Sequence, residues 1–168
     1  MRLGPILAAT ALAALVAGCN KSSTPPASDQ SAATPAAPSA PAAMSDADKA
    51  KALAALPAPY NTADIANGEA KFALCQTCHT LPQGGANMTG PNLWGVVGTK
   101  AGEGHDDFKF SDALKASNIT WTPDKIDTWI TKPADMVPGT KMSFAGMKDA
   151  KDRTDVIAYL MVNTGYKP

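Results

Sequence analysis

The apolar positions of this chain repeat at helical spacing in three stretches, and no stretch alternates as a half-buried strand would. The first stretch follows Thr62, a residue type that often caps the N-terminus of a helix. Its inward positions lie three and four residues apart: Ile65, Gly68, Phe72 and Cys75. The spacing predicts a first helix that begins after Thr62 and turns this face toward a core.

A second and a third helix are expected nearer the C-terminus. Thr122 can cap the second helix, and the Lys132-Pro133 pair ends it. The third helix runs from about Asp149 to Thr164, with Gly165 placed to terminate it. Both carry an apolar face, formed by Ile126, Trp129 and Ile130 in the second helix and by Val156, Ile157, Leu160 and Met161 in the third. The pattern predicts an all-α domain with three main helices.

More than forty residues separate the first and second helices, and this segment shows no strong hydrophobic period. It is rich in Gly, Asn and Pro, which favour turns and loops. A loop of this length is uncommon inside a compact domain unless something other than secondary structure organises it. A large buried cofactor would do so.

The first 18 residues are typical of a targeting segment. Arg2 is their only charge, and the apolar run from Leu3 to Ala17 is shorter than the ~20 residues that a membrane-spanning helix needs. The string Val16-Ala17-Gly18-Cys19 resembles a bacterial lipoprotein box. This resemblance implies that the signal peptide 1–18 is removed and that Cys19 is lipidated; the alternative is an ordinary signal peptide with an incidental cysteine.

Residues 19–60 have the composition of a tether. Seven of the 14 prolines of the chain lie there, at positions 25, 26, 35, 38, 41, 57 and 59, with much Ala and Ser. Such a segment buries too little apolar surface to offset its ordering entropy. A short helix over Asp46 to Leu56 fits the sequence, since Pro57 and Pro59 would end it. The folded domain is therefore expected over residues 61–168.

Charge and cysteine content narrow the function. Fifteen Lys and Arg balance 15 Asp and Glu, so the chain lacks the basic surplus with which proteins bind nucleic acid. Three cysteines cannot all pair with one another. A disulfide-stabilised scaffold and a nucleic-acid-binding protein are both disfavoured.

The chemistry is carried by Cys75-Gln76-Thr77-Cys78-His79, which has the C-x-x-C-H spacing of c-type haem attachment. Two thiols one helical turn apart can each bond a vinyl group at one porphyrin edge, and the next residue offers an imidazole to the iron. A dithiol redox pair would need a strand–helix–strand setting, and a zinc site would need four ligands. The sequence offers neither, so we expect one haem c bound through Cys75 and Cys78.

His79 would supply one axial ligand, and the other is left open by the residues alone. Of the seven methionines, only Met136, Met142 and Met147 lie at suitable positions outside the signal, the tether, the haem motif's immediate neighbourhood and the third helix. The remaining histidine, His105, lies in a charged, glycine-flanked stretch. We expect His105 to face solvent.

Several further motifs, together with C-x-x-C-H, resemble the class I cytochromes c of mitochondria and bacteria. They occur in the family's order and spacing across nearly all of 61–168: Gly90-Pro91-Asn92-Leu93, Asn118-Ile119-Thr120-Trp121, Pro138-Gly139-Thr140-Lys141-Met142 and Ile157-Ala158-Tyr159-Leu160. The resemblance implies a small cytochrome c fold, with three main helices and long loops around one covalent haem.

The resemblance also implies residue roles. Met142 would be the distal iron ligand, and the Pro91 carbonyl would accept the imidazole N–H of His79. Trp121 would donate its indole N–H to a haem propionate, and Thr140 would lie near the propionates or the Met142 loop.

In the same way, Gly68 and Phe72 would pack against Val156 and Tyr159 where the first and last helices cross. Two residues depart from the family: Phe110 where a propionate-binding tyrosine is common, and Trp129 where a tyrosine often lies beside the axial methionine.

Taken together, these features predict a monomeric, membrane-tethered one-electron carrier, lipid-anchored on the periplasmic side of a bacterial membrane, and not an enzyme. The resemblance implies a cytochrome bc complex as donor and a terminal oxidase or reductase as acceptor. The alternatives are the haem subunit or electron acceptor of a periplasmic dehydrogenase, a peroxidase, and a haem-based gas sensor.

Overall fold

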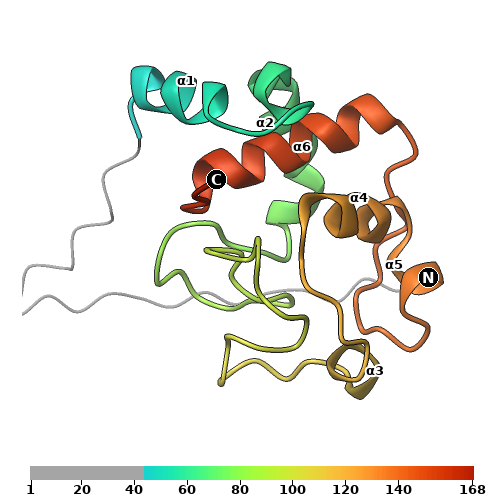
Figure 1. Ribbon diagram of the computed structural model, residues 1–168. Helices are drawn as coiled ribbons and strands as arrows, with labels where there is room; N and C mark the ends of the chain where they lie inside the picture. The colour runs from blue at the N-terminus through green and yellow to red at the C-terminus, as the bar shows by residue number, and fades with distance from the viewer. Residues whose placement is uncertain (1–43) are drawn as a thin grey trace, which may run out of the picture. The chain divides into compact units, whose positions relative to one another are not determined.

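Six α-helices and one 3-10 turn make up the regular structure of residues 44–168, the part of the chain that the computed structural model describes (Figure 1). The expected signal peptide and Cys19, the expected site of lipidation, lie outside the described residues. The elements are α1 (Asp46–Ala54), η1 (Tyr60–Thr62), α2 (Ile65–Gln76), α3 (Asp112–Lys115), α4 (Pro123–Thr131), α5 (Pro133–Met136) and α6 (Ala150–Asn163).

The predicted all-α class is confirmed. Between residues 44 and 168 no strand forms, and the only β-type pairing is one isolated antiparallel bridge between Lys100 and Thr120. No helix in this range is long and apolar enough to span a bilayer.

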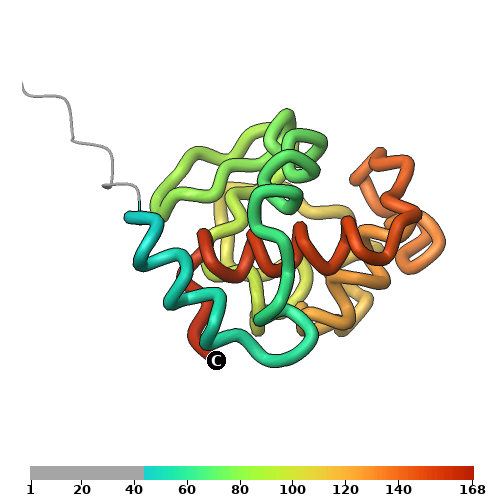
Figure 2. Tube along the Cα trace, turned by 90° about the horizontal axis from the view of Figure 1, so that it is seen from above, coloured from blue at the N-terminus to red at the C-terminus, as the bar shows by residue number. Residues whose placement is uncertain are grey.

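Helices α2 and α6 cross closely, and this crossing is the centre of the fold (Figure 2). Gly68 lies at the contact, where an added Cβ would overlap the carbonyl oxygen of Asp155 and lie 2.9 Å from the Cβ of Tyr159. The Phe72 and Tyr159 rings pack with their centroids 5.5 Å apart. The predicted pairing of Gly68 and Phe72 with the last helix is therefore present.

The beginning of α2 differs from the prediction. Asp64, not Thr62, is the N-cap, and its carboxylate accepts a hydrogen bond of 3.0 Å from the backbone N–H of Asn67. Thr62 belongs to the preceding 3-10 turn, where its hydroxyl donates to the carbonyl of Pro59. Because the backbone is extended at Ala63, helical geometry starts only after Asp64.

The other predicted helix ends are confirmed. Thr122 accepts from the N–H of Lys125 at the start of α4, and Asp149 accepts from Asp152 at the start of α6. Gly165 follows α6 with φ of +73°, the left-handed conformation that glycine adopts readily. The two short helices α3 and α5 were not predicted, because four residues are too few to show a period.

Residues 44–60 also differ from the prediction, since they are folded and not part of a spacer. The short helix expected there forms as α1 and contacts α6 (Figure 2). Leu56 and Tyr60 are buried in the core. Among the described residues, the folded part accordingly begins with α1 and not at residue 61. The average composition of 19–60 concealed the apolar residues that gather at its C-terminal end.

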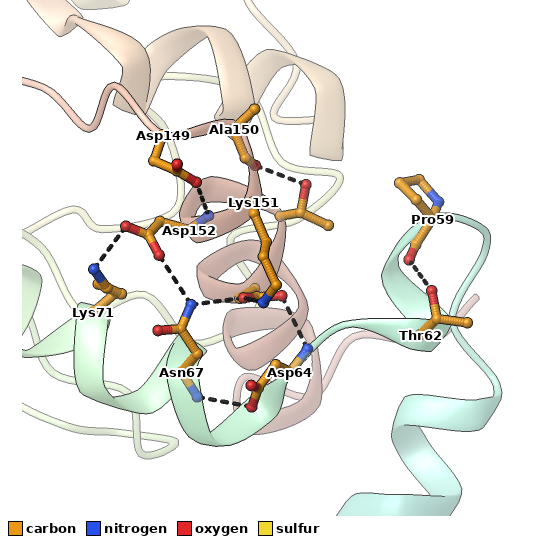
Figure 3. Close-up of polar contacts among 11 residues, drawn as sticks. Pro59, Thr62, Asp64, Asn67, Lys71, Asp149, Ala150, Lys151 and Asp152 are labelled. Carbon is orange, nitrogen blue, oxygen red and sulfur yellow. Dashed lines mark hydrogen bonds and ion pairs between the residues drawn. The ribbon is translucent and has the colours of Figure 1, made fainter.

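Polar groups reinforce the crossing of α2 and α6 (Figure 3). The carboxylate of Asp155, only 2% exposed, accepts hydrogen bonds from the backbone N–H of Asp64, the amide of Asn67 and the ammonium of Lys151, at 2.9, 2.7 and 2.6 Å. The same amide of Asn67 reaches Asp152 at 3.0 Å. These bonds join the first turn of α2 to the first half of α6.

Candidate cofactor site

A cavity of about 390 Å³ lies between the helices and the long loops. Its helical wall is apolar and comes from α2, α4 and α6, through Phe72, Ile126, Trp129, Ile130, Val156 and Leu160. The opposite wall comes from the segment between α2 and α4 and from residues 140–144. The segment that shows no hydrophobic period in the sequence thus forms one wall of this cavity.

The C-x-x-C-H motif lies at one edge of this cavity. Cys75 is in the last turn of α2, and the backbone N–H groups of Cys78 and His79 both donate to its carbonyl at 3.0 Å. The chain therefore continues one tight turn beyond the helix. Both thiols and the imidazole line the cavity as a result.

The thiols do not have the character of a redox pair. Burial, and then the neighbouring Cys78, raise the pKa of the Cys75 thiol to about 11. Reactive dithiols have lowered pKa values, because the thiolate is the nucleophile. Within residues 44–168 no group of three His, Cys, Asp or Glu side chains could hold a metal ion, so a zinc site also gains no support there.

The imidazole of His79 is fixed in one orientation. Its Nδ1 lies 2.7 Å from the carbonyl oxygen of Pro91, so Nδ1 carries the proton and Nε2 is left as the nitrogen that can bind a metal. Burial lowers the pKa of His79, against the raising effect of this hydrogen bond, and the ring stays neutral. A Cβ at Gly90 would overlap the ring, so glycine is needed there.

Among the methionines of residues 44–168, Met142 alone lines the cavity. Its backbone N–H donates to the hydroxyl of Thr140, which lines the cavity as well. Met147, the second of the three candidates, is buried in the core and its N–H is bonded to the carbonyl of Ile130. Met136, the third, packs against the core outside the cavity.

The remaining predicted residues also meet at this cavity. Trp121 is 8% exposed and packs against Trp129 with ring centroids 5.2 Å apart. Phe110 lines the same space and makes an edge contact with Phe108 at 4.8 Å. The cavity therefore gathers every site residue predicted within the described range.

His105 is the residue that sequence reasoning placed wrongly. It is half-buried and lines the cavity instead of facing solvent. Its charged and glycine-rich neighbours suggested an exposed loop. The one indication in the sequence that His105 lies near the cofactor is that it comes only five residues before Phe110, which the resemblance places at the haem.

The residues present fit haem c. Two thiols with the spacing of the vinyl groups, a neutral imidazole with Nε2 available and a thioether surround a space with apolar walls. Soft sulfur and imidazole nitrogen are ligands that suit iron in haem proteins.

Comparison with known proteins agrees with this geometry. The pattern of the cytochrome c family matches residues 65–163. A cytochrome c2 of Agrobacterium tumefaciens is 36% identical over 108 residues, which cover 62% of this chain and 96% of that protein. A cytochrome c homolog of Bradyrhizobium diazoefficiens is 48% identical over 99 residues, 59% of this chain, and the match spans only 54% of that relative.

A solved structure shows the same fold. Cytochrome cH from Methylobacterium extorquens is 50% identical and superimposes with a TM-score of 0.54, covering 58% of this chain and 96% of that one. The chain therefore belongs to the cytochrome c family: it is an electron carrier that holds one haem c, attached covalently through Cys75 and Cys78.

Proposed function

We propose that this cytochrome is a lipid-anchored one-electron carrier of the periplasm, with His79 and Met142 as the two axial ligands of its iron. The observation that carries the ligand assignment is that Met142 is the one described methionine on the cavity wall. With both axial positions filled by protein, no position is open for a substrate, which favours electron transfer over peroxidase chemistry.

Haem bound in this cavity supplies one iron that takes up and releases a single electron. The protein's own residues set its surroundings. His79 is oriented by the Pro91 carbonyl, and the Thr140 hydroxyl holds the backbone of Met142 in place. Trp121, which is buried at the cavity, would donate its indole N–H to a propionate. Contacts of this kind would hold the ligands in one geometry when the haem gains or loses an electron, and this would limit reorganisation during transfer.

The ligand set also biases the iron toward the reduced state. A thioether is neutral and soft, so it favours Fe(II) over Fe(III) and raises the reduction potential. The apolar helical wall acts in the same direction, because it disfavours the additional positive charge of the ferric form.

Replacing the proposed distal ligand tests this assignment. In Met142→Ala we expect the reduction potential to fall by on the order of 0.1 V or more, within the range that axial ligands control. The oxidised protein should also lose the near-infrared absorption band of the ferric iron–thioether bond. Potential and band are measured by spectroelectrochemistry.

The control is Met88→Ala, which removes an exposed methionine outside the cavity lining. It should leave both the potential and the band unchanged. An unaltered potential in Met142→Ala would instead assign the iron to Met136 or Met147.

The anchor is proposed from the sequence before the described residues. Cys19 would carry the lipid, and a stretch rich in Pro, Ala and Ser separates it from α1 in the sequence. By composition, about 26 such residues would reach about 28 Å as a coil and about 80 Å as polyproline. A tether of this reach holds the domain near membrane partners at an effective concentration of up to ~mM.

Fractionation tests the anchor. Cys19→Ala should move the protein from membranes into the soluble fraction, whereas Ser22→Ala, a nearby change that spares the thiol, should leave it on the membrane. Retention of Cys19→Ala on membranes would favour an uncleaved signal that serves as the anchor.

The proposed partners are a cytochrome bc complex as donor and a terminal oxidase or reductase as acceptor. Pull-down of the anchored protein from its own membranes, followed by rapid-mixing reduction and oxidation with each copurifying complex, tests them. Fast reduction by a periplasmic dehydrogenase, with none by a bc complex, would replace this assignment.

A further inference from the structure

One continuous segment of the fold, residues 72–99, contains no Asp, Glu, Lys or Arg. These four residue types make up 18% of the chain, and the segment of equal length before it, 44–71, contains seven of them. Charged side chains lie almost always at the surface of a folded domain. A segment of this length without any of them therefore leaves an uncharged surface wherever it is exposed.

Large apolar side chains are exposed on this segment. Four large hydrophobic side chains are exposed between residues 44 and 168, and three of them belong to 72–99: Leu74, Met88 and Trp94, with exposed fractions of 59%, 49% and 36%. Exposed apolar side chains that share one region of a surface often mark an interaction site. We call the exposed part of residues 72–99 the uncharged face.

Hydrogen bonds join the parts of the uncharged face. The N–H of Met88 donates to the carbonyl of Gly90 at 2.8 Å, and the N–H of Gly90 donates to the carbonyl of Cys78 at 2.9 Å. The loop that carries Met88 is therefore attached directly to the C-x-x-C-H motif, which follows Leu74 in the chain.

Trp94 has a fixed position on the uncharged face. A Cβ at Gly165 would lie 2.6 Å from its ring, so the ring rests directly on the glycine just after α6. The backbone N–H of Trp94 donates to the side-chain oxygen of Asn92 at 3.0 Å. An aromatic ring that is already held in place loses little conformational freedom on binding, and Trp is enriched among the residues that contribute most to protein–protein affinity.

The uncharged face adjoins the cofactor cavity. Leu74 and Trp94 line this cavity and are also exposed, so the cavity wall reaches the surface there. Because the haem is attached through Cys75 and Cys78 of the same segment, its attached edge comes close to this face. A redox partner that docks here reaches the cofactor without displacing any part of the fold.

Charged groups of both signs surround the uncharged face. Lys71 of α2 forms an ion pair with Asp152 at 2.7 Å, and Asp107 accepts a hydrogen bond of 2.8 Å from Asn87. The loop 100–109, which follows the segment, contains two lysines and three carboxylates: Lys100, Glu103, Asp106, Asp107 and Lys109. These surroundings provide no strong field of one sign with which a charged partner would be steered.

We propose that the uncharged face, with Leu74, Met88 and Trp94, is the docking surface for the redox partner, and that this partner presents an apolar, uncharged surface to it. This docking depends on the carrier function proposed above. A freely diffusing carrier gains from electrostatic steering, which accelerates encounter. A carrier anchored on its partner's membrane has an effective concentration of up to ~mM, so apolar contact suffices to bind it.

In the docked complex one electron passes from the reduced cofactor of the partner to the ferric haem, or from the ferrous haem to the oxidised cofactor of the partner. No bond forms or breaks. The docking surface therefore determines how fast the carrier meets its partner and leaves the reduction potential unchanged.

The first test measures the rates of haem reduction and oxidation in membranes that contain the full-length protein, by rapid mixing with respiratory substrate and then with the terminal electron acceptor. Between about 10 and about 200 mM salt we expect less than about a twofold change, because salt screens only charged contacts. This measurement needs no variant. A rate that falls steeply with salt would show electrostatic docking and overturn the proposal.

The second test places a charge on the uncharged face. In Met88→Lys the ammonium would lose water against an uncharged partner, so we expect the rates to fall by about threefold to tenfold. The reduction potential and the near-infrared band should stay native, because Met88 is exposed outside the cavity lining. Ala50→Lys, which adds the same charge at an exposed position of α1, should keep the native rates.

The sign of the change in Met88→Lys identifies the surface of the partner. Faster transfer at low salt would show an acidic partner, and unchanged rates would show docking elsewhere; both overturn the proposal. Native membranes that neither reduce nor oxidise the cytochrome would instead contradict the carrier function itself.

A lipid surface is the other occupant that an exposed Trp could contact. Hydrogen exchange of the anchored holoprotein in vesicles of phosphatidylethanolamine and phosphatidylglycerol separates the two. Without a partner, the amides of residues 80–95 should gain no protection from the vesicles. Protection of these amides by lipid alone would assign the uncharged face to the membrane and overturn the proposal.

Discussion

The two sides of α6 are completed in different ways. Toward the start of α2 the protein itself closes the contact, because Gly68 admits the Asp155 backbone. Hydrogen bonds join the two helices there (Figure 3), and no buried side-chain polar atom of residues 44–168 lacks a partner. On the other side, Val156 and Leu160 form part of the cavity wall. That side is where haem c would complete the core.

The difference shows how one helix can serve both as scaffold and as cofactor wall. Side-chain packing fixes α2 against α6, so Cys75 at the end of α2 starts from a rigid position. The segment between α2 and α4 contains one short helix, α3, so we expect its order to depend on what occupies the cavity. One core therefore contains both a contact that the protein packs by itself, between α2 and α6, and a wall that we expect to need haem for its packing.

Loss of the haem should have the largest effect. Without haem the apolar wall of this cavity would face water, and the burial of each large apolar side chain contributes about 1.5–3 kcal/mol. A small domain has a free energy of unfolding of roughly 5–15 kcal/mol. The burial of the cavity wall by haem is therefore expected to be comparable with the whole free energy of unfolding, and the domain should not fold stably without it.

Cys78→Ala tests this dependence. We expect impaired covalent attachment, a large loss of helical circular dichroism and loss of amide protection in the loops around the cavity. Gln76→Ala, a change at an exposed position of the same motif that does not line the cavity, should behave as the native chain. A haem-free variant with native helix content would show that the protein-filled side suffices for folding.

The second prediction concerns the contact between α2 and α6, which side chains and backbone of the protein fill without a cofactor. In Gly68→Val the added atoms meet the Asp155 backbone, which cannot move without displacing α6. We expect a loss of about 3 kcal/mol, at the upper end of overpacking effects. Guanidinium unfolding of the holoprotein measures it. Ala70→Val, at an exposed position of the same helix, should lose well under 1 kcal/mol, the helix propensity difference alone.

The two sides also differed in how well the sequence predicted them. Helix faces, the cap at Thr122 and the start of the last helix near Asp149 depend on residues a few positions apart, and the structure agrees with all three. The long loop gave no period, but its length and glycines indicated that a cofactor organises it.

What the sequence did not reveal depends on contacts between distant segments. The burial of Leu56 and Tyr60 follows from the docking of α1 on α6, about a hundred residues later in the chain. His105 lines the cavity, and the glycines before it turn the loop with positive φ. From the charged and glycine-rich composition of this loop, we had expected His105 to be exposed. The cap at Asp64 was missed by two residues, because an unpredicted 3-10 turn precedes it.

The smallest predicted effect concerns the buried carboxylate of Asp155 at the contact between α2 and α6. Burial alone raises the pKa of the Asp155 carboxyl, but hydrogen bonds from Lys151, Asn67 and the N–H of Asp64 outweigh it and hold this pKa below its ordinary value of 3.8. The carboxylate therefore stabilises the folded state above about pH 4, and this stabilisation is lost as pH falls through the lowered pKa.

Asp155→Asn keeps the shape of the side chain but removes the charged acceptor. The new amide N–H₂ would then face the donors that Asp155 accepts from, on Asp64, Asn67 and Lys151. We expect a loss of about 1–2 kcal/mol at pH 7, typical of a disturbed buried hydrogen-bond group. Because the native chain loses the same stabilisation on acidification, the gap between the two unfolding free energies should narrow from pH 5 to pH 3. Glu69→Gln, at an exposed carboxylate of α2, should match the native chain throughout. A gap that stays constant with pH would mean that Asp155 acts through its shape and not its charge, and the α2–α6 contact would then depend on Gly68 and the aromatic packing alone.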